Sequence, residues 1–389
     1  MAQSIQTEVA VVGAGLVGMT AAIALAQLHR PVVLIDAKAA MTATTPEWDA
    51  RVYALTEHTI AWLTAIGVWA HVDITRIQAI DAMQLWGHDS ESALTLNAED
   101  AHLMHMGCII ENQNLMVACW QALLATEVPM QTAACVKMVQ STDCAWLSLS
   151  NGATVQAQLI LAADGAQSWV RQQAHVNTRL VPFDQIAIVA NYAAAQAHHA
   201  VARQWFDAHE TLALLPLPQQ LVSMVWALPT ARATALLSLA PQALADQVAL
   251  RSQHLLGDLK PVGQTLSFML NQQTAQQFIA QRVVFMGDAA HQVHPMAGQG
   301  VNLGFKDVIK LCELAIKLNR LQDIGDAGFL RQYERARKLD VLAMNGLTSG
   351  LDTLFASQQS SLKQVTRWGM QWLNKSHVVK QYLIQQATL

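Results

Sequence analysis

Three glycines near the start of the chain have the spacing of a phosphate-binding turn. Gly13, Gly15 and Gly18 separate a Val-rich run from an Ala/Leu-rich run, so we expect a strand, a turn and a helix in that order. Gly13 permits a tight turn, Gly15 lets the backbone approach a pyrophosphate, and Gly18 lets the helix pack closely on the strand. The N–H groups around Ala14 and the helix N-terminus then face the phosphates.

An acidic residue follows at the distance that a dinucleotide site requires. Asp36 comes after the apolar run 32–35, where its carboxylate can accept hydrogen bonds from the hydroxyls of a ribose. A chance glycine turn is the alternative, and the placement of Asp36 counts against it. The fingerprint does not by itself separate NAD from FAD, so the choice depends on the rest of the chain.

Two further motifs combine glycine with a carboxylate. The first is LAADGAQSWVR, residues 161–171, in which Asp164 precedes a glycine. The second is GDAAHQVHPMAGQGVNLG, residues 287–304, which contains Gly287, Asp288, Pro295, Gly298, Gln299, Gly300, Val301 and Asn302. The first resembles the Asp-Gly motif of the class A flavoprotein monooxygenases, which include para-hydroxybenzoate hydroxylase. The second matches the Gly-Asp motif of that family almost throughout.

A narrower resemblance rests on shorter runs. DARVYALT at 49–56, the pair Glu111 and Asn112, and the run 298–304 are similar to the ubiquinone-biosynthesis hydroxylases within that family. Together the motifs extend over most of the chain in the order that the family has. Gln113 departs from the pattern, because arginine is commoner at this place.

The resemblance implies that the chain binds FAD and that each motif contacts part of it. Asp288 would bind the ribityl hydroxyls, which a carboxylate accepts in charge-assisted bonds. The 298–300 turn would open a helix near Val301, whose N–H groups favour negative charge on the reduced flavin by about 0.3 to 1 kcal/mol. Glycine lets the backbone approach the ring there, and Pro295 fixes the preceding bend. All residues named from this motif, with those of the first motif and Asp36, are candidate FAD contacts.

Arg51 and Asp164 carry less specific signals. By resemblance Arg51 lies near the flavin, and a surface salt bridge is the ordinary alternative. Asp164 would contact the FAD pyrophosphate and the route of the nicotinamide, although an Asp-Gly pair after a strand is also a common turn. His291 and His294 have the spacing of metal ligands, but the sequence offers no third ligand, and we expect no metal site.

The resemblance also implies a reaction. A reduced nicotinamide, NADH or NADPH, gives a hydride to FAD, molecular oxygen forms a flavin C4a-hydroperoxide, and one oxygen atom passes to an electron-rich ring. Because the cofactor performs this chemistry, a compact catalytic triad is not expected. The substrate would be a prenylated phenol on the route to ubiquinone. Two alternatives stay open: a related flavoprotein reductase or halogenase, and a non-catalytic flavin-bound scaffold of a quinone-synthesis complex.

The elements that must hold these motifs follow from apolar periodicity and turn residues. We predict strands at 8–12, 32–35, 159–163, 186–189, 211–215, 221–227 and 282–286, and helices at 19–28, 59–69, from about 112, within 230–255, and at 301–318. Asn151 with Gly152 predicts a two-residue hairpin turn, because both central positions of such a turn need positive φ.

The cofactor motifs flank the middle of the chain, which indicates one discontinuous domain with another inserted into it. We expect an α/β protein with a Rossmann-like FAD-binding domain of glutathione-reductase type, an inserted mixed-sheet substrate domain and a helical C-terminus. The assignment is 1–75, 111–177 and 270–340 for the FAD-binding domain, 76–110 and 178–269 for the substrate domain, and 341–389 for the C-terminal segment.

Composition narrows the function classes. Charged residues are 13% of the chain, against roughly 25% in an average globular protein, which fits a large apolar pocket. The net charge of -4 and the lack of a basic cluster argue against nucleic acid as a partner. The five cysteines show no metal-ligand spacing, which suits reduced thiols in the cytoplasm. We expect no signal peptide and no membrane span.

The C-terminal segment has a different charge balance. From residue 351 onward it has one acidic residue and four basic ones, Lys363, Arg367, Lys375 and Lys380, among apolar residues. This pattern predicts peripheral contact with the inner face of a membrane or with other ubiquinone-biosynthesis proteins. A helix packed on the protein's own core is the alternative.

Overall fold

The first sheet is built around the Val-rich opening of the chain. The computed structural model describes residues 4–87, 93–207, 210–292, 300–319, 322–356 and 381. Strand β1 (Ser4–Val12) lies between β2 (Val32–Asp36) and β11 (Thr154–Ala162) and is parallel to both. Helix α1 (Leu16–Gln27) connects β1 to β2. The apolar runs are buried because helices cover a parallel sheet on its faces.

Shorter strands complete this sheet. They are β8 (Met130–Thr132), β9 (Cys135–Gln140), β10 (Ala145–Leu149), β17 (Ile279–Ala280) and β18 (Val283–Phe285). The order is β17-β18-β11-β1-β2-β8, and β10 and β9 are added antiparallel beside β11. Segments from the start, middle and end of the chain therefore meet in one sheet.

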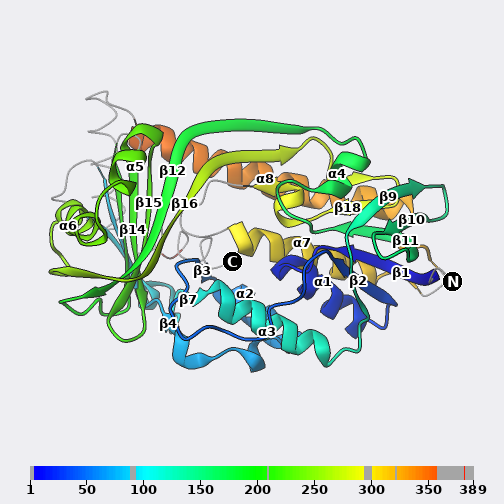
Figure 1. Ribbon diagram of the computed structural model, residues 1–389, viewed down its shortest axis with the longest axis horizontal. Coiled ribbons are helices and arrows are strands. Elements are labelled where there is room, and N and C mark those ends of the chain that lie inside the picture. Colours follow the sequence, from blue (N-terminus) through cyan, green and yellow to red (C-terminus); the bar gives the residue numbers. More distant parts are fainter. Residues whose placement is uncertain are drawn as a thin grey trace.

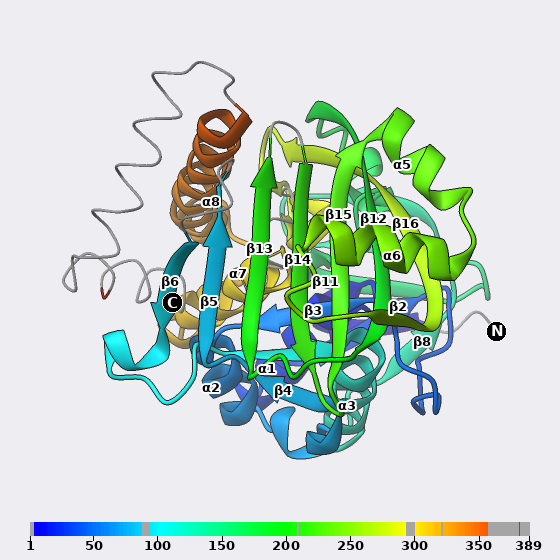
Figure 2. The same cartoon turned by 90° about the vertical axis from the view of Figure 1, so that its left-hand side faces the viewer.

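A second, mixed sheet forms the other end of the molecule (Figure 1). Its strands, in the order β19-β16-β12-β15-β14-β13-β5-β6, are β19 (His291–Gln292), β16 (Leu259–Ala275), β12 (Thr178–Ala194), β15 (Leu221–Pro229), β14 (Glu210–Leu217), β13 (Val201–Asp207), β5 (Ala82–Trp86) and β6 (Ala93–Asn97). Helices α5 (Thr230–Leu237) and α6 (Pro241–Arg251) cover its outer face, as Figure 2 shows. Trp205 and Trp226 are buried in the core beneath them.

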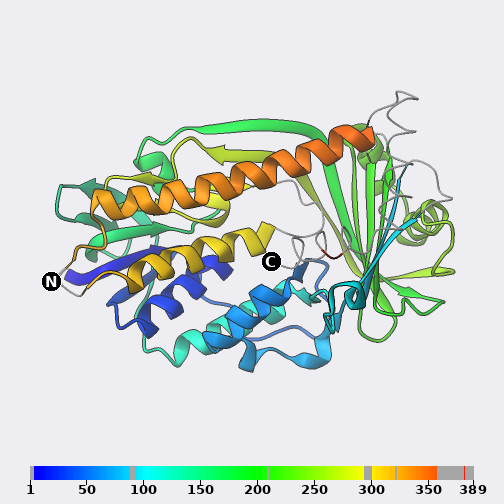
Figure 3. The same cartoon turned by 180° about the vertical axis from the view of Figure 1, so that it is seen from behind.

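Between the two sheets lies a small antiparallel one. It has the order β3-β7-β4, from β3 (Val52–Leu55), β7 (Cys108–Glu111) and β4 (Ile77–Ala79). The helices around it and along the molecule are α2 (Glu57–Ala65), α3 (Asn112–Leu124), α4 (Trp169–Gln173), α7 (Gly300–Ile316) and α8 (Ala327–Ala356). Short 3-10 turns occur at Trp69–His71, Ile74–Arg76, Ala98–Ala101 and Gly287–Ala289. Helix α8 runs from the first sheet to the second (Figure 3).

The predicted α/β fold is confirmed, and most predicted elements appear within a few residues of their expected bounds. A hairpin connects β10 and β11 at this place, but it is not the predicted two-residue turn. The Leu149 N–H donates to the Ala153 carbonyl across a three-residue loop, and of Asn151 and Gly152 only Gly152 has a positive φ, 85°. The helix expected at 59–69 is α2, which ends at Ala65, followed by a 3-10 turn. Strand β12 is far longer than the predicted run 186–189.

The domain boundaries stay a prediction. The predicted boundary at 178 coincides with the start of β12, whereas the one at 270 falls within β16. Among the residues that the structure describes, no helix is both long enough and apolar enough to cross a membrane.

Candidate flavin site

The first glycine motif has the backbone geometry that its residue types require. Gly13 has a φ of 106°, and its N–H donates to the Ile35 carbonyl at 2.8 Å. A Cβ on Gly13 would lie 2.4 Å from the Ala163 carbonyl oxygen, and one on Gly18 would lie 1.8 Å from the Gly13 carbonyl oxygen. Both positions therefore require glycine.

Gly15, by contrast, faces open space. It is the N-cap of α1, and none of the heavy atoms that the structure describes lies within 4 Å of a Cβ built on it. Asp36 closes the turn beside it, because its Oδ2 accepts from the Ala14 N–H at 2.6 Å and its Oδ1 accepts from the Lys38 N–H at 2.8 Å. Each carboxylate oxygen can still accept a second hydrogen bond, as a ribose contact requires.

A buried arginine joins the second motif to the third. The Oδ2 of Asp164 accepts from the Val170 N–H at 3.0 Å, whereas its Oδ1 is buried without a partner among the described residues. Arg171 donates to the carbonyls of Ala166 and Ala289, each at 2.7 Å. A buried acceptor without a partner costs about 1 to 3 kcal/mol. The free oxygen of Asp164 is therefore suited to accept a hydrogen bond from a ligand.

The third motif packs directly on the first. Gly287 has a φ of 55° and donates its N–H to Oδ2 of Asp307 at 2.8 Å. The Cγ2 atom of Val17 would lie 3.1 Å from a Cβ on Gly287 and 2.6 Å from one on Gly304. The start of the third motif and helix α7 thus lie against the first turn of α1, with no room for larger residues.

Asp288 lies near Arg51 and Tyr53. Its side chain is exposed, yet desolvation raises the pKa of its carboxyl, while electrostatic effects of His291 and Arg51 oppose the rise. An exposed side chain whose carboxyl is also desolvated is expected where protein surrounds the carboxylate on most sides but does not cover it. Burial also raises the pKa of Tyr53 to about 12. Arg51 acts to lower this pKa, and Asp288 acts to raise it further. The Arg51 guanidinium lies 5.4 Å from the centre of the Tyr53 ring.

The N-terminus of α7 is fixed to the end of β3. Helix α7 begins at Gly300, and no heavy atom of the described residues lies within 4 Å of a Cβ built there. The Asn302 side chain donates to the Ala54 carbonyl at 2.7 Å and accepts from the Thr56 N–H at 3.3 Å. Asn302 is thus a link between α7 and β3, and Val301 beside it packs against the main core. Pro295, Gly298 and Gln299 lie outside the described residues, as does His294.

Comparison with known proteins identifies the family. A family model described as FAD binding domain matches residues 6–345. Ubiquinone hydroxylase UbiL of Rhodospirillum rubrum is 31% identical over 384 residues, which cover 98% of this chain and 89% of the relative. This chain belongs to the FAD binding domain family.

Two further comparisons agree with this family assignment. The 3-demethoxyubiquinol 3-hydroxylase of Escherichia coli is 28% identical to this flavoprotein over 391 residues, 98% of both chains. The crystal structure of p-nitrophenol 4-monooxygenase PnpA from Pseudomonas putida has a TM-score of 0.79 at 18% identity and covers 99% of this chain and 98% of its own, which shows the shared fold. The predicted FAD-dependent aromatic monooxygenase of class A is confirmed.

The residues present fit an FAD nucleotide. Within the described part of the chain, the flavoprotein has open space in front of Gly15 and Gly300, an acceptor without a partner on Asp164, and an exposed carboxylate on Asp288. These features come from three separate motifs that contact one another. The first turn of α1 would hold the pyrophosphate, Asp36 a ribose and Asp288 the ribityl chain, and these individual contacts remain predictions.

Sequence reasoning missed a buried ionic cluster beneath the flavoprotein's third motif. Asp307 on α7 accepts from Nε2 of His291 at 2.7 Å and from Nε of Arg337 on α8 at 2.6 Å. Burial acts to raise the pKa of Asp307, but its partners outweigh this effect and lower it. An aspartate in the apolar repeat of α7 was the one available signal. His291 therefore has a partner other than the metal that its spacing with His294 suggested.

Proposed function

We propose that this flavoprotein hydroxylates the aromatic ring of a polyprenylated phenol or benzoquinol in ubiquinone biosynthesis, with NAD(P)H and molecular oxygen as co-substrates. The observation that carries the proposal is the contact among three flavin motifs, in a chain whose relatives at 31% and 28% identity are named ubiquinone or demethoxyubiquinol hydroxylases over nearly its full length. The redox chemistry, which includes activation of oxygen, belongs to bound FAD.

The chain's own residues would bind FAD, orient it and shield it from water. Asp288 offers a carboxylate to ribityl hydroxyls, and the N–H groups at the start of α7 favour negative charge in front of them by about 0.3 to 1 kcal/mol. Asn302 keeps that helix end in register with β3. The chemistry that bound FAD would supply needs water to be kept away, and an apolar wall on the opposite side would do this.

The second sheet supplies such a wall. Cross-strand pairing places Val189 opposite Leu266 and Ala187 opposite Phe268 on one face of β12 and β16. Asn191 shares this face and contacts the carbonyl of Asp49 in the segment that leads to Arg51. Leu266 and Phe268 are exposed although they are large and apolar. An apolar ring with a prenyl chain is the kind of ligand that would cover them.

We further propose that the C-terminal segment gives peripheral contact with the inner face of a membrane or with other ubiquinone-biosynthesis proteins. Its four basic residues lie outside the described part of the chain. A prenylated substrate would dissolve in the bilayer, which supports an enzyme that works at its surface. Truncation after Ala356 should then lower the fraction that sediments with anionic vesicles, without lowering FAD content.

The test of the hydroxylase is product analysis. The purified protein should be yellow, should oxidise NADH or NADPH in the presence of a prenylphenol, and should place one labelled oxygen atom from ¹⁸O₂ in the product. Turnover without label would favour a reductase, and a halogenated product a halogenase. Rescue of a hydroxylase-deficient strain by Asp288→Ala would favour a scaffold, and a colourless protein that FAD cannot reconstitute would end the proposal.

A further inference from the structure

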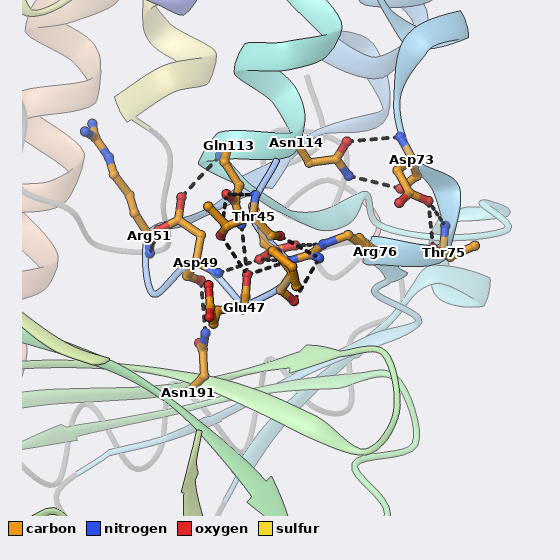
Figure 4. A network of polar contacts seen from close by, with 12 residues as sticks. Thr45, Glu47, Asp49, Arg51, Asp73, Thr75, Arg76, Gln113, Asn114 and Asn191 are labelled. Atoms are coloured by element: carbon orange, nitrogen blue, oxygen red, sulfur yellow. Dashed lines mark hydrogen bonds and ion pairs between the residues drawn. The ribbon is translucent and has the colours of Figure 1, made fainter. Parts of the chain in front are cut away.

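The segment that leads into β3 has no regular secondary structure of its own. Residues 45–51 precede Val52, the first residue of β3. Polar side chains from other parts of the chain hold this segment, which we call the pre-β3 segment (Figure 4). Its last residue, Arg51, carries the guanidinium that lies near Tyr53 and influences Asp288. The position of Arg51 therefore depends on what fixes the backbone before it.

Arg76 holds three consecutive carbonyls of the pre-β3 segment. Its Nη1 donates to the carbonyls of Thr45 at 3.3 Å and Pro46 at 3.4 Å, and its Nη2 donates to that of Glu47 at 2.9 Å. The same guanidinium lies over the Trp48 ring, 4.7 Å from its centre. A planar group with five donors can make these contacts together, whereas an ammonium group cannot.

Glu111 links Arg76 to Asp49, which precedes Arg51 by two residues. It is fully buried at the end of β7, and its two oxygens accept from Nε of Arg76 at 2.6 Å and Nη2 at 2.8 Å. Its Oε1 also accepts from the Asp49 N–H at 2.6 Å, and Oδ1 of Asp49 accepts from the Arg51 N–H at 2.9 Å. A continuous series of short polar contacts thus runs from Arg76 to the backbone of Arg51.

Two further contacts fix the same segment from other sides. The N–H of Asn112 donates to the Arg51 carbonyl at 2.9 Å, and Oδ1 of Asn112 accepts from the Tyr53 hydroxyl at 3.2 Å. Asn191 on β12 donates to the Asp49 carbonyl at 2.9 Å. Figure 4 shows the Arg51 side chain pointing away from this network. Its backbone is held by the network, whereas its guanidinium lies by the Tyr53 ring.

We propose that Arg76 is a positioning residue of the flavin site, which fixes the pre-β3 segment through Glu111 and so sets where Arg51 and Tyr53 stand beside Asp288. Arg76 itself is turned towards the pre-β3 segment and Glu111. This inference rests on FAD binding and not on the identity of the substrate, so it stands or falls separately from the proposed hydroxylation.

The test compares Arg76→Lys and Arg76→Met with a matched control, Arg282→Lys. The Arg282 side chain is 7% exposed against 14% for Arg76, and it likewise binds one carboxylate, that of Asp323, together with carbonyls, those of Thr142 and Gln158. None of its hydrogen-bond partners belongs to the pre-β3 segment. A purely structural role for Arg76 would make the two arginines equivalent.

Two readouts separate positioning from general stability. Hydrogen–deuterium exchange of the full chain, stripped of FAD, should rise by about tenfold in the peptide covering 45–53 in Arg76→Met, since at least one charge-assisted bond is lost, and by less in Arg76→Lys. The dissociation constant for FAD, measured by quenching of flavin fluorescence, should rise in the same order. The visible spectrum of bound flavin should shift in both variants.

Arg282→Lys should lower the melting temperature while leaving exchange at 45–53, the FAD dissociation constant and the flavin spectrum unchanged. If Arg76→Met does not fold, the comparison of Arg76→Lys with Arg282→Lys still tests whether Arg76 positions the pre-β3 segment. The proposal is overturned if the Arg76 variants leave exchange and FAD affinity at the wild-type level, or if Arg282→Lys changes them equally.

Discussion

Val17, in the first glycine motif, packs against Gly304 of α7, although the two are far apart in the sequence. A Cβ on Gly304 would lie 2.6 Å from Cγ2 of Val17 and 3.4 Å from the Cα of Gly287. This contact joins the first glycine turn to α7. Its loss would separate two of the elements that are predicted to hold FAD.

Gly304→Ala should therefore destabilise the protein even without FAD. Forcing a methyl group into a filled space costs about 1 to 3 kcal/mol, because Val17 and the helix backbone must move apart. The measurement is urea unfolding of the apoprotein, followed by titration with FAD. Unchanged stability would mean that α1 and α7 are not packed as described.

Gly15→Ala should have the opposite pattern. The Cβ would enter open space, so the free energy of unfolding of the apoprotein should stay within about 0.5 kcal/mol of wild type. FAD affinity should fall by about tenfold or more, because the methyl group would occupy the approach of the pyrophosphate. Wild-type FAD affinity in Gly15→Ala would contradict the assignment of this turn to the cofactor.

The glycine motifs could be predicted from sequence because part of what they require is local. The positive φ of Gly13 and the approach of Gly18 to the Gly13 carbonyl depend on the chain within a few residues, whereas the Ala163 carbonyl that would meet a Cβ on Gly13 belongs to the second motif. Asp288 was identified through resemblance, and its place beside Arg51 required the fold. The links of Arg76 and Asn191 to the pre-β3 segment join residues that are far apart in the sequence, which no local pattern records.

Strand β16 could not be predicted for a related reason. It pairs with β12 along its length but with β19 only at its far end, so much of it is an edge strand. Many of its side chains are exposed on both faces, and it contains Pro261 and Gly263. An alternating apolar pattern arises when one face is buried, and here neither face is buried over most of the strand.

Asp288→Asn should stabilise the apoprotein while weakening FAD binding. The pKa of Asp288 is raised in the folded protein, so its ionised form destabilises the fold above that pKa. The variant should therefore gain stability at pH 7, by less than about 1 kcal/mol because the side chain is exposed. The gain should shrink as the pH falls towards about 4, the ordinary value for aspartate. Equal stability at pH 7 with unchanged FAD affinity would remove Asp288 from the site.

Asp307→Asn should be strongly destabilising. It would leave Arg337 and His291 buried without their carboxylate, a loss of about 3 to 5 kcal/mol, and it would weaken the contact with the Gly287 N–H. Asp340→Asn is the matched control, because Asp340 pairs with the same arginine but is exposed, and exposed pairs contribute about 0 to 1 kcal/mol.

The pH dependence of the Asp307 effect has a definite sign. The folded pKa of Asp307 is lowered, so its contribution is present above the unfolded value of about 3.9 and is lost as the pH falls through the folded value. The difference in unfolding free energy between wild type and Asp307→Asn should stay level from about pH 7 to 5 and narrow below about 4. Urea unfolding at a series of pH values measures it. If Asp307→Asn costs no more than Asp340→Asn at pH 7, the cluster does not hold Gly287 in place, and the geometry of the third motif must depend on the chain around it alone.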